Sequence, residues 1–146
     1  IEASGHTLLL AFLQSNDLCM QRVGAFGVGN LCVQERHREA MVEAGALEPL
    51  VTLALSLTVP HEIRRYAVLA IANLASDDTT HETFIEEGML PHLVSLSNSK
   101  NDEIRQFAAF SLVKMTQNSD IRELVVKAGG LEPVLYLART RDAEIQ

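Results

Sequence analysis

The segment MVEAGALEPLVTLA, residues 41–54, decides the fold because the chain contains it three times. It returns as FIEEGMLPHLVSLS at residues 84–97 and as VVKAGGLEPVLYLA at residues 125–138. The shared glycines are Gly45, Gly88 and Gly129, so the period is about 40 residues. A period of this length is typical of a solenoid, in which stacked repeats bury a common core.

A second block repeats in register with the first. EIRRYAVLAIANLA (62–75) returns as EIRQFAAFSLVKMT (103–116), and CMQRVGAFGVGNLC (19–32) is a more divergent earlier copy. The EIQ of residues 144–146 marks the start of another copy. We therefore expect one array over residues 1–146, with repeats at 1–33 (lacking a first helix), 34–76, 77–118 and 119–146 (truncated).

Each period reads as three helices. The first is short and charged, runs from Glu35 to Glu43 in one copy, and ends at the shared glycine, which adopts left-handed backbone angles without strain. The second has a proline in its first turn, where the missing N–H costs nothing. The third is apolar on most sides and must be buried between neighbours. No alternating strand pattern occurs, so the sequence predicts an all-α fold with three-helix repeats of about 41–43 residues.

Composition narrows the classes of function. The 146 residues carry a net charge of −7, which disfavours a uniformly basic nucleic-acid-binding protein. The longest apolar runs, such as residues 8–13, are too short to insert into a membrane. Two cysteines make no disulfide framework, and this favours a reducing compartment.

The glycine break and the third-helix pattern carry a family resemblance. The pattern (Ile/Val)-x-x-Gly-x-Leu-x-Pro-x-Val, followed by Ala-x-Asn-Leu-Ala, resembles armadillo repeats over essentially the whole chain. The resemblance implies a right-handed superhelix that serves as a non-enzymatic scaffold for other proteins. The chain is similar to cytoplasmic multi-repeat scaffolds of the vacuolar and cilium-associated armadillo types. A cytoplasmic location follows, with a membrane-peripheral, cytoskeletal or nuclear one left open.

The third helices supply the candidate binding site. On a concave face, exposed residues recur every three or four positions, and we phase them on the recurring asparagine. The expected peptide-binding groove consists of Arg22, Phe26, Asn30, Arg65, Leu69, Asn73, Gln106, Phe110 and Lys114, with Asp77 and Asn118 continuing two of the rows. By resemblance, Asn30 and Asn73 bind the backbone of an extended peptide, since an amide offers both donors and an acceptor. Alternatively, each asparagine bonds to a neighbouring helix or loop.

Two departures from the family pattern bear on the choice of peptide. Lys114 stands where the asparagine row continues, and the chain has no tryptophan, so recognition of a nuclear localisation signal is disfavoured. Arg22, Arg65 and Lys114 against Asp77 predict a locally positive groove, which suits an acidic or neutral peptide. The alternative is that these cations are solvated and cover apolar surface with their stems.

Catalytic and metal-binding patterns are weak. The glycines at 24, 27 and 29 follow no strand and fail the dinucleotide pattern, so we interpret them as small residues that allow close helix contact. Asp77, Asp78, His81 and Glu82 have metal-like side chains, but Thr79 and Glu82 also fit a helix-capping box. Cys19 is expected to be exposed. We predict no enzyme activity, no metal and no cofactor.

Other roles remain open. One alternative is a structural spacer within a larger protein, and another is an array that associates with itself through repeats that lack a helix. Recruitment to a membrane or the cytoskeleton would depend on parts outside this chain.

Overall fold

The computed structural model describes the backbone of residues 3–145 and the side chains of residues 5–140. Within that range the chain forms ten helices and no strand. They are α1 (Ala3–Leu13), α2 (Leu18–Leu31), α3 (Glu35–Glu43), α4 (Leu47–Leu55), α5 (His61–Leu74), α6 (Asp78–Glu86), α7 (Leu90–Leu96), α8 (Asp102–Thr116), α9 (Arg122–Lys127) and α10 (Leu131–Ile145). The predicted all-α fold is confirmed.

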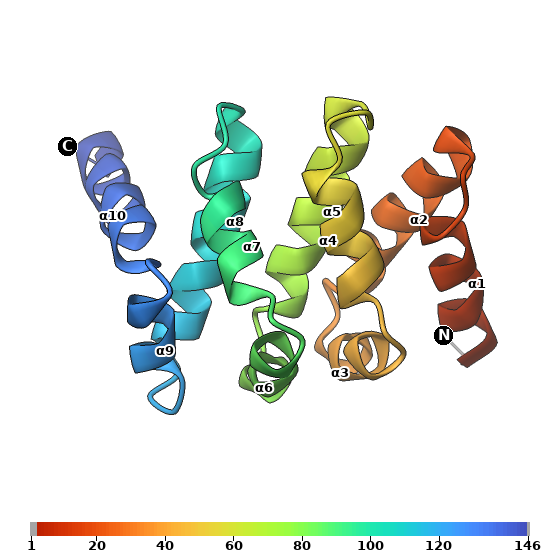
Figure 1. Cartoon of the computed structure of the whole chain (residues 1–146). Coiled ribbons are helices and arrows are strands. Elements are labelled where there is room, and N and C mark those ends of the chain that lie inside the picture. The colour runs from red at the N-terminus through yellow and green to blue at the C-terminus, as the bar shows by residue number, and fades with distance from the viewer. Residues whose placement is uncertain (1–2, 146) are drawn as a thin grey trace.

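The helices stack in one direction, with the two ends of the chain at opposite ends of the stack (Figure 1). The short helices α3, α6 and α9 lie along one edge, while α1, α4 and α7 form a second row. The long helices α2, α5 and α8 form a third row, in which each helix packs against the next. This row carries the residues predicted to bind a partner.

The shared glycines end the short helices as predicted. Gly45, Gly88 and Gly129 have φ angles of 94°, 70° and 93°, in the left-handed region that glycine tolerates. After the first of them, the Ala46 N–H donates to the Met41 carbonyl at 3.1 Å, as in a Schellman motif. The turn directs the chain into the second helix.

The core runs continuously through the stack because the third helices are buried on most of their surface. Ile63, Ala67, Ala70 and Leu74 of α5 have no exposed surface, which confirms the predicted apolar side of this helix. Two of the three early glycines also allow close contact as predicted, whereas at Gly29 a Cβ atom would lie at an ordinary 3.9 Å from Ala70. A Cβ atom on Gly24 would lie 2.8 Å from the Leu13 backbone nitrogen, and one on Gly27 would lie 2.7 Å from Leu9 Cδ2.

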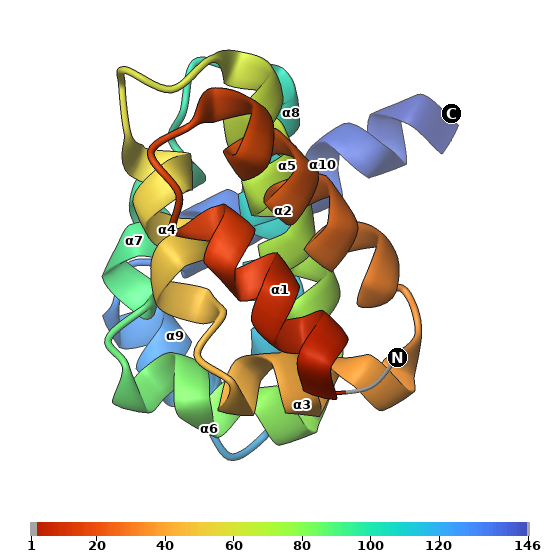
Figure 2. The ribbon, with the colours of Figure 1, turned by 90° about the vertical axis from the view of Figure 1, so that its right-hand side faces the viewer.

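Two local predictions are wrong. Thr79 does not cap a helix: α6 begins at Asp78, so Thr79 lies inside its first turn, and no side chain caps this helix from the N-cap position. The second concerns α10, which continues to Ile145 through the residues expected to form a loop and start a third helix. Residues 138–144 hold no glycine or proline to break the helix, and Figure 2 shows its end extending away from the stack.

Candidate functional site

The predicted groove residues lie on the row formed by α2, α5 and α8, and all nine are at least partly exposed. Asp17 fixes the start of α2 by accepting hydrogen bonds from the N–H groups of Cys19 and Met20. Asn101 caps α8 in the same way through the N–H of Ile104. These caps fix where α2 and α8 begin.

Three predicted residues meet around a small hollow between α2 and α5. Phe26, Asn30 and Leu69 line a cavity of about 40 Å³, together with Ala25, Gly29 and Tyr66. The Phe26 side chain is half exposed beside it. Within the described residues, the Asn30 side chain makes no hydrogen bond, so its amide is open to a partner on this face.

Tyr66 is a residue of this surface that the sequence analysis missed. Its ring packs edge-on against Phe26, with 5.2 Å between the ring centroids, and the Arg65 guanidinium lies 5.6 Å from the Tyr66 centroid. A signal for Tyr66 was present in its polar hydroxyl, because a tyrosine usually keeps that end near water.

The predicted positive charge of the groove is wrong for two of its three cations. Arg22 Nε lies 3.0 Å from a carboxylate oxygen of Glu62, and Arg65 Nε lies 3.2 Å from one of Glu103. Each pair joins one third helix to the next. The glutamates neutralise the arginines, and Lys114 is the only one of the three predicted cations without an ion pair in the described part of the chain.

Asn73 already has a partner inside the molecule. Its Nδ2 donates to the Gly29 carbonyl of α2 at 2.9 Å. That carbonyl lies in the last turn of α2, and the N–H that a longer helix would supply, that of Val33, donates to Asn30 O instead. Asn73 therefore satisfies an otherwise unpaired helix-end carbonyl, so at this position the structure shows the alternative that the sequence left open.

Helix α8 presents a different surface from α2 and α5. Lys114 Nζ lies 5.3 Å from the centroid of the Phe110 ring, at the distance of a cation–π contact. Gln106 stands where the two earlier helices carry the paired arginines. The asparagine position of this row therefore holds an amide on α2 and α5 and a lysine on α8.

Asp77 and Asn118 do not belong to the groove. Asp77 accepts from Arg38 of α3 at 2.6 Å, and Asn118 Nδ2 lies 3.0 Å from His81 Nδ1 of α6. The helices end before both residues, so the helical spacing that placed them on the groove no longer applies.

Among the candidate metal ligands, His81 is also bonded to groups of the protein, like Asp77 and Asn118. His81 is buried, and its Nε2 lies 2.6 Å from the Ala75 carbonyl. Since a carbonyl only accepts, Nε2 donates to Ala75, and the Asn118 amide lies at hydrogen-bond distance from Nδ1. Among the described residues no group of three or more His, Cys, Asp or Glu side chains is arranged to hold a metal ion.

The two cysteines differ in their exposure to solvent. Cys19 is exposed, as predicted, and Cys32 is buried. Burial raises the pKa of the Cys32 thiol to about 12, against a smaller opposing effect of the Arg38 charge. Cys32 is therefore a poor nucleophile at neutral pH.

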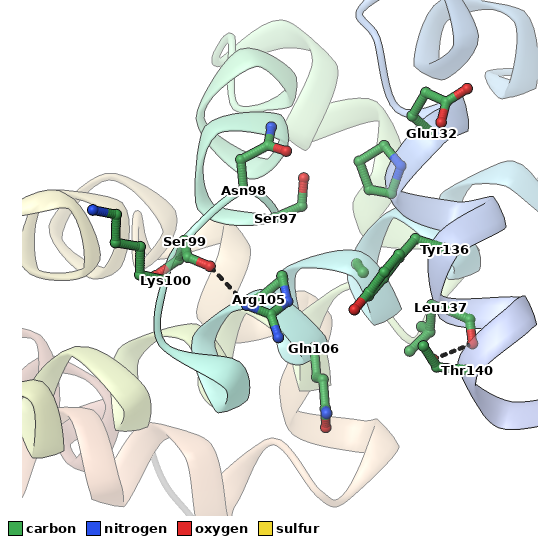
Figure 3. A pocket seen from close by; sticks show the side chains of 12 residues that line it. Ser97, Asn98, Ser99, Lys100, Arg105, Gln106, Glu132, Tyr136, Leu137 and Thr140 are labelled. Atoms are coloured by element: carbon green, nitrogen blue, oxygen red, sulfur yellow. Dashed lines mark hydrogen bonds between the residues drawn. The ribbon is translucent and has the colours of Figure 1, made fainter. Parts of the chain in front are cut away.

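A larger hollow of about 650 Å³ lies between α8 and α10. Arg105 and Gln106 of α8 and Tyr136 of α10 line it, and Figure 3 shows Arg105 between Ser99 and Tyr136, with the Gln106 amide turned away from Tyr136. Arg105 is held there by the Ser99 carbonyl at 3.1 Å and lies 6.0 Å from the Tyr136 ring centroid. The hollow occupies the place beside α8 where α2 and α5 are each covered by a following third helix.

No helix in the part of the chain that the structure describes is long and apolar enough to cross a membrane.

Comparisons with protein families support the repeat structure. The Armadillo/beta-catenin-like repeat family matches residues 34–76, and the HEAT repeat family matches residues 89–119. No curated protein matches the chain.

Solved structures of engineered proteins share the fold. An engineered protein is 30% identical with a TM-score of 0.84, over 99% of this chain and 35% of its own. A designed armadillo repeat protein is 26% identical with a TM-score of 0.79, over 88% of this chain and 55% of its own. Another, in complex with the peptide (KR)4, is 27% identical with a TM-score of 0.79, over 88% of this chain and 54% of its own. The chain thus spans about half the length of these two designed proteins.

Proposed function

Because this chain belongs to the armadillo-repeat family, we propose that it is a non-enzymatic scaffold that binds an extended peptide along α2, α5 and α8. The observation that carries the proposal is the surface between α2 and α5. There the unpaired Asn30 amide stands beside exposed Phe26 and the hollow lined by Tyr66 and Leu69. The amide would bind the peptide main chain, and the apolar side chains would supply desolvation energy.

A neutral or acidic peptide fits this surface best. Arg22 and Arg65 are already paired with glutamates, so they neither demand an acidic partner nor leave acids free for a basic one. Lys114, farther along the row, favours an acidic residue at that end. The designed relative in complex with (KR)4 therefore differs from this chain in the peptide charge we expect.

The test is a peptide-display selection followed by affinity measurements on Asn30→Ala. We expect wild-type protein to select extended peptides and Asn30→Ala to weaken them by about 5- to 30-fold, since the variant loses hydrogen bonds to the peptide. Asn16→Ala is the matched control, because Asn16 is exposed in the α1–α2 loop away from this row. Asn73→Ala is unsuitable because it also removes the bond to Gly29.

Two results would contradict the proposal: a selection that yields no peptide, or peptides whose affinity Asn30→Ala and Phe26→Ala leave unchanged. Basic, neutral and acidic versions of a selected peptide then test the charge preference. Equal or tighter binding of the basic version would reject that part alone.

A second candidate function is a rigid spacer, and the bonds across the stack support it. Arg38–Asp77 and Asn73–Gly29 each join helices of successive repeats. For a spacer, no peptide would bind to the third-helix row.

A cytoplasmic location agrees with the two free cysteines, which a reducing compartment maintains.

A further inference from the structure

The ring of Tyr66 in α5 is held by side chains on two sides. Phe26 of α2 packs edge-on against it, with 5.2 Å between the ring centroids. The Arg65 guanidinium lies 5.6 Å from the Tyr66 centroid, within the range of a cation–π contact. The position of the Tyr66 ring therefore depends in part on where the Arg65 side chain lies.

A carboxylate on the next third helix fixes the Arg65 side chain. Arg65 Nε lies 3.2 Å from a carboxylate oxygen of Glu103, which belongs to α8. Successive residues of a helix point in directions about 100° apart, so the place of Arg65 in α5 does not by itself bring its guanidinium to the Tyr66 ring. The Glu103 carboxylate holds the guanidinium where it lies beside that ring.

The equivalent ion pair between α2 and α5 supports no ring. Arg22 Nε lies 3.0 Å from a carboxylate oxygen of Glu62, so the two arginines are paired in the same way. Val23 follows Arg22 where Tyr66 follows Arg65, and a valine offers no ring to a guanidinium. The Arg65 side chain is 34% exposed and that of Arg22 is 45% exposed, as expected if Arg65 covers part of the ring. The two ion pairs thus differ in whether the arginine contacts an aromatic side chain.

We propose that Glu103 is a positioning residue for peptide binding, acting through Arg65 on Tyr66. The inference rests on the proposed function, because it concerns the surface between α2 and α5 where the peptide binds. Tyr66 and Phe26 line the hollow there, so a shift of the Tyr66 ring changes the shape that a peptide side chain meets. Glu103 does not line that hollow and acts from the next helix.

The first test compares Glu103→Gln with Glu62→Gln, because each variant removes one carboxylate and leaves one arginine unpaired. The probe is an uncharged peptide selected by display on the wild-type protein, so an unpaired arginine neither attracts nor repels it. Isothermal titration calorimetry measures the dissociation constants. We expect Glu103→Gln to raise the dissociation constant by about 3- to 10-fold, and Glu62→Gln to raise it by less than about twofold.

Exchanging the two charges separates positioning from a merely structural role. Arg65→Glu combined with Glu103→Arg again allows an ion pair between α5 and α8, but it removes the guanidinium that α5 places beside Tyr66. Urea denaturation should show the stability of wild-type protein restored, whereas peptide binding should stay as weak as in Glu103→Gln. Circular dichroism should show every variant folded, since both ion pairs lie at the surface.

A further measurement needs no peptide. In a Tyr136→Phe background Tyr66 is the only tyrosine of the chain, so its ring signals are assigned directly in NMR spectra. Nuclear Overhauser effects between the Tyr66 and Phe26 rings should weaken when Glu103→Gln is added. They should persist when Glu62→Gln is added instead.

Three outcomes would overturn the proposal. They are equal peptide affinities of Glu103→Gln and Glu62→Gln, unchanged contacts between the two rings in Glu103→Gln, and binding restored by the exchanged pair. The last would show that the surface needs an ion pair rather than a guanidinium beside Tyr66. A selection that yields no peptide rejects the proposed function, and the NMR comparison then decides by itself whether Glu103 positions Tyr66.

Discussion

Two junctions of the stack occupy equivalent places and are closed by different polar contacts. In the first junction, α2 and α3 meet α5 and α6 through Arg22–Glu62, Arg38–Asp77 and the Asn73–Gly29 bond. In the second junction, α5 and α6 meet α8 and α9. It keeps one ion pair, Arg65–Glu103, and has the hydrogen-bonded pair His81–Asn118 in place of Arg38–Asp77.

The difference at Asn73 shows how one junction can dispense with a bond that the other needs. Lys114 takes the place of Asn73 in the second junction, and the carbonyl equivalent to that of Gly29 belongs to Ala72. The Ser76 hydroxyl donates to this carbonyl at 3.1 Å from within the same helix end. Val33, at the place of Ser76 in the first junction, has no hydroxyl, so the carbonyl there depends on the neighbouring helix.

The largest expected effect is on the reactivity of Cys32, which lies in the first junction beside Arg38. With a pKa of about 12, about one Cys32 thiol in ten thousand is ionised at pH 8, and burial excludes reagents as well. We expect iodoacetamide to modify Cys19 in the native protein. Cys32 should react at least about a thousandfold more slowly than in denatured protein. Mass spectrometry of Cys19→Ser isolates Cys32, and its complete labelling within minutes under native conditions would show that this junction opens readily.

The next largest effect is on the free energy of unfolding and concerns His81 in the second junction. His81→Ala should lower the free energy of unfolding by about 3 kcal/mol, because it removes a buried ring and leaves the Ala75 carbonyl without its side-chain donor. Urea denaturation measures the change. His61→Ala, at the exposed start of α5, should stay within about 0.5 kcal/mol of wild type. Equal losses in the two variants would mean that the His81 contacts add nothing.

Asp77→Asn makes the first junction resemble the second, which has Asn118 at this place. We expect a loss of about 1–2 kcal/mol, below the cost for a fully buried pair because both side chains keep some contact with water. Unfolding at low and high salt should show a smaller salt dependence than in wild type, since the ion pair is gone. Glu39→Gln removes the same charge from an exposed site on α3 and controls for net charge. An unchanged salt response in Asp77→Asn would rule out a stabilising ion pair.

The smallest effect has the opposite sign. Gly29→Ala gives the first junction the alanine that the second has at residue 72, and the new Cβ would meet Ala70 at an ordinary 3.9 Å. We expect stabilisation of about 0.5–1 kcal/mol from helix propensity, seen as a higher midpoint of thermal unfolding. Gly24→Ala has the same propensity gain but places its Cβ 2.8 Å from a backbone atom, so it should destabilise. Stabilisation by both variants would mean that α1 packs loosely on α2.

Much of the fold could be predicted because its signals are local. The left-handed glycines, the prolines of the second helices and the apolar third helices act within a few residues of themselves, and all three features occur where predicted. The α10 prediction failed where no local signal ends the helix. The groove was predicted less completely: Tyr66 was missed, and Asp77 and Asn118 were assigned to it although their helices had already ended.

The sequence by itself determined the period, the helix ends and the side of each helix that enters the core, because these follow from backbone preference and apolar spacing. The tertiary structure decided which polar side chains of the third-helix row are free to meet a partner. Asn30 and Asn73 occupy equivalent places, yet Asn73 bonds to a carbonyl 44 residues away. Arg38 finds Asp77 across 39 residues in the same way. Such pairings depend on how neighbouring helices stack. The spacing of residues along a single helix cannot show which residue of another helix lies within bonding distance.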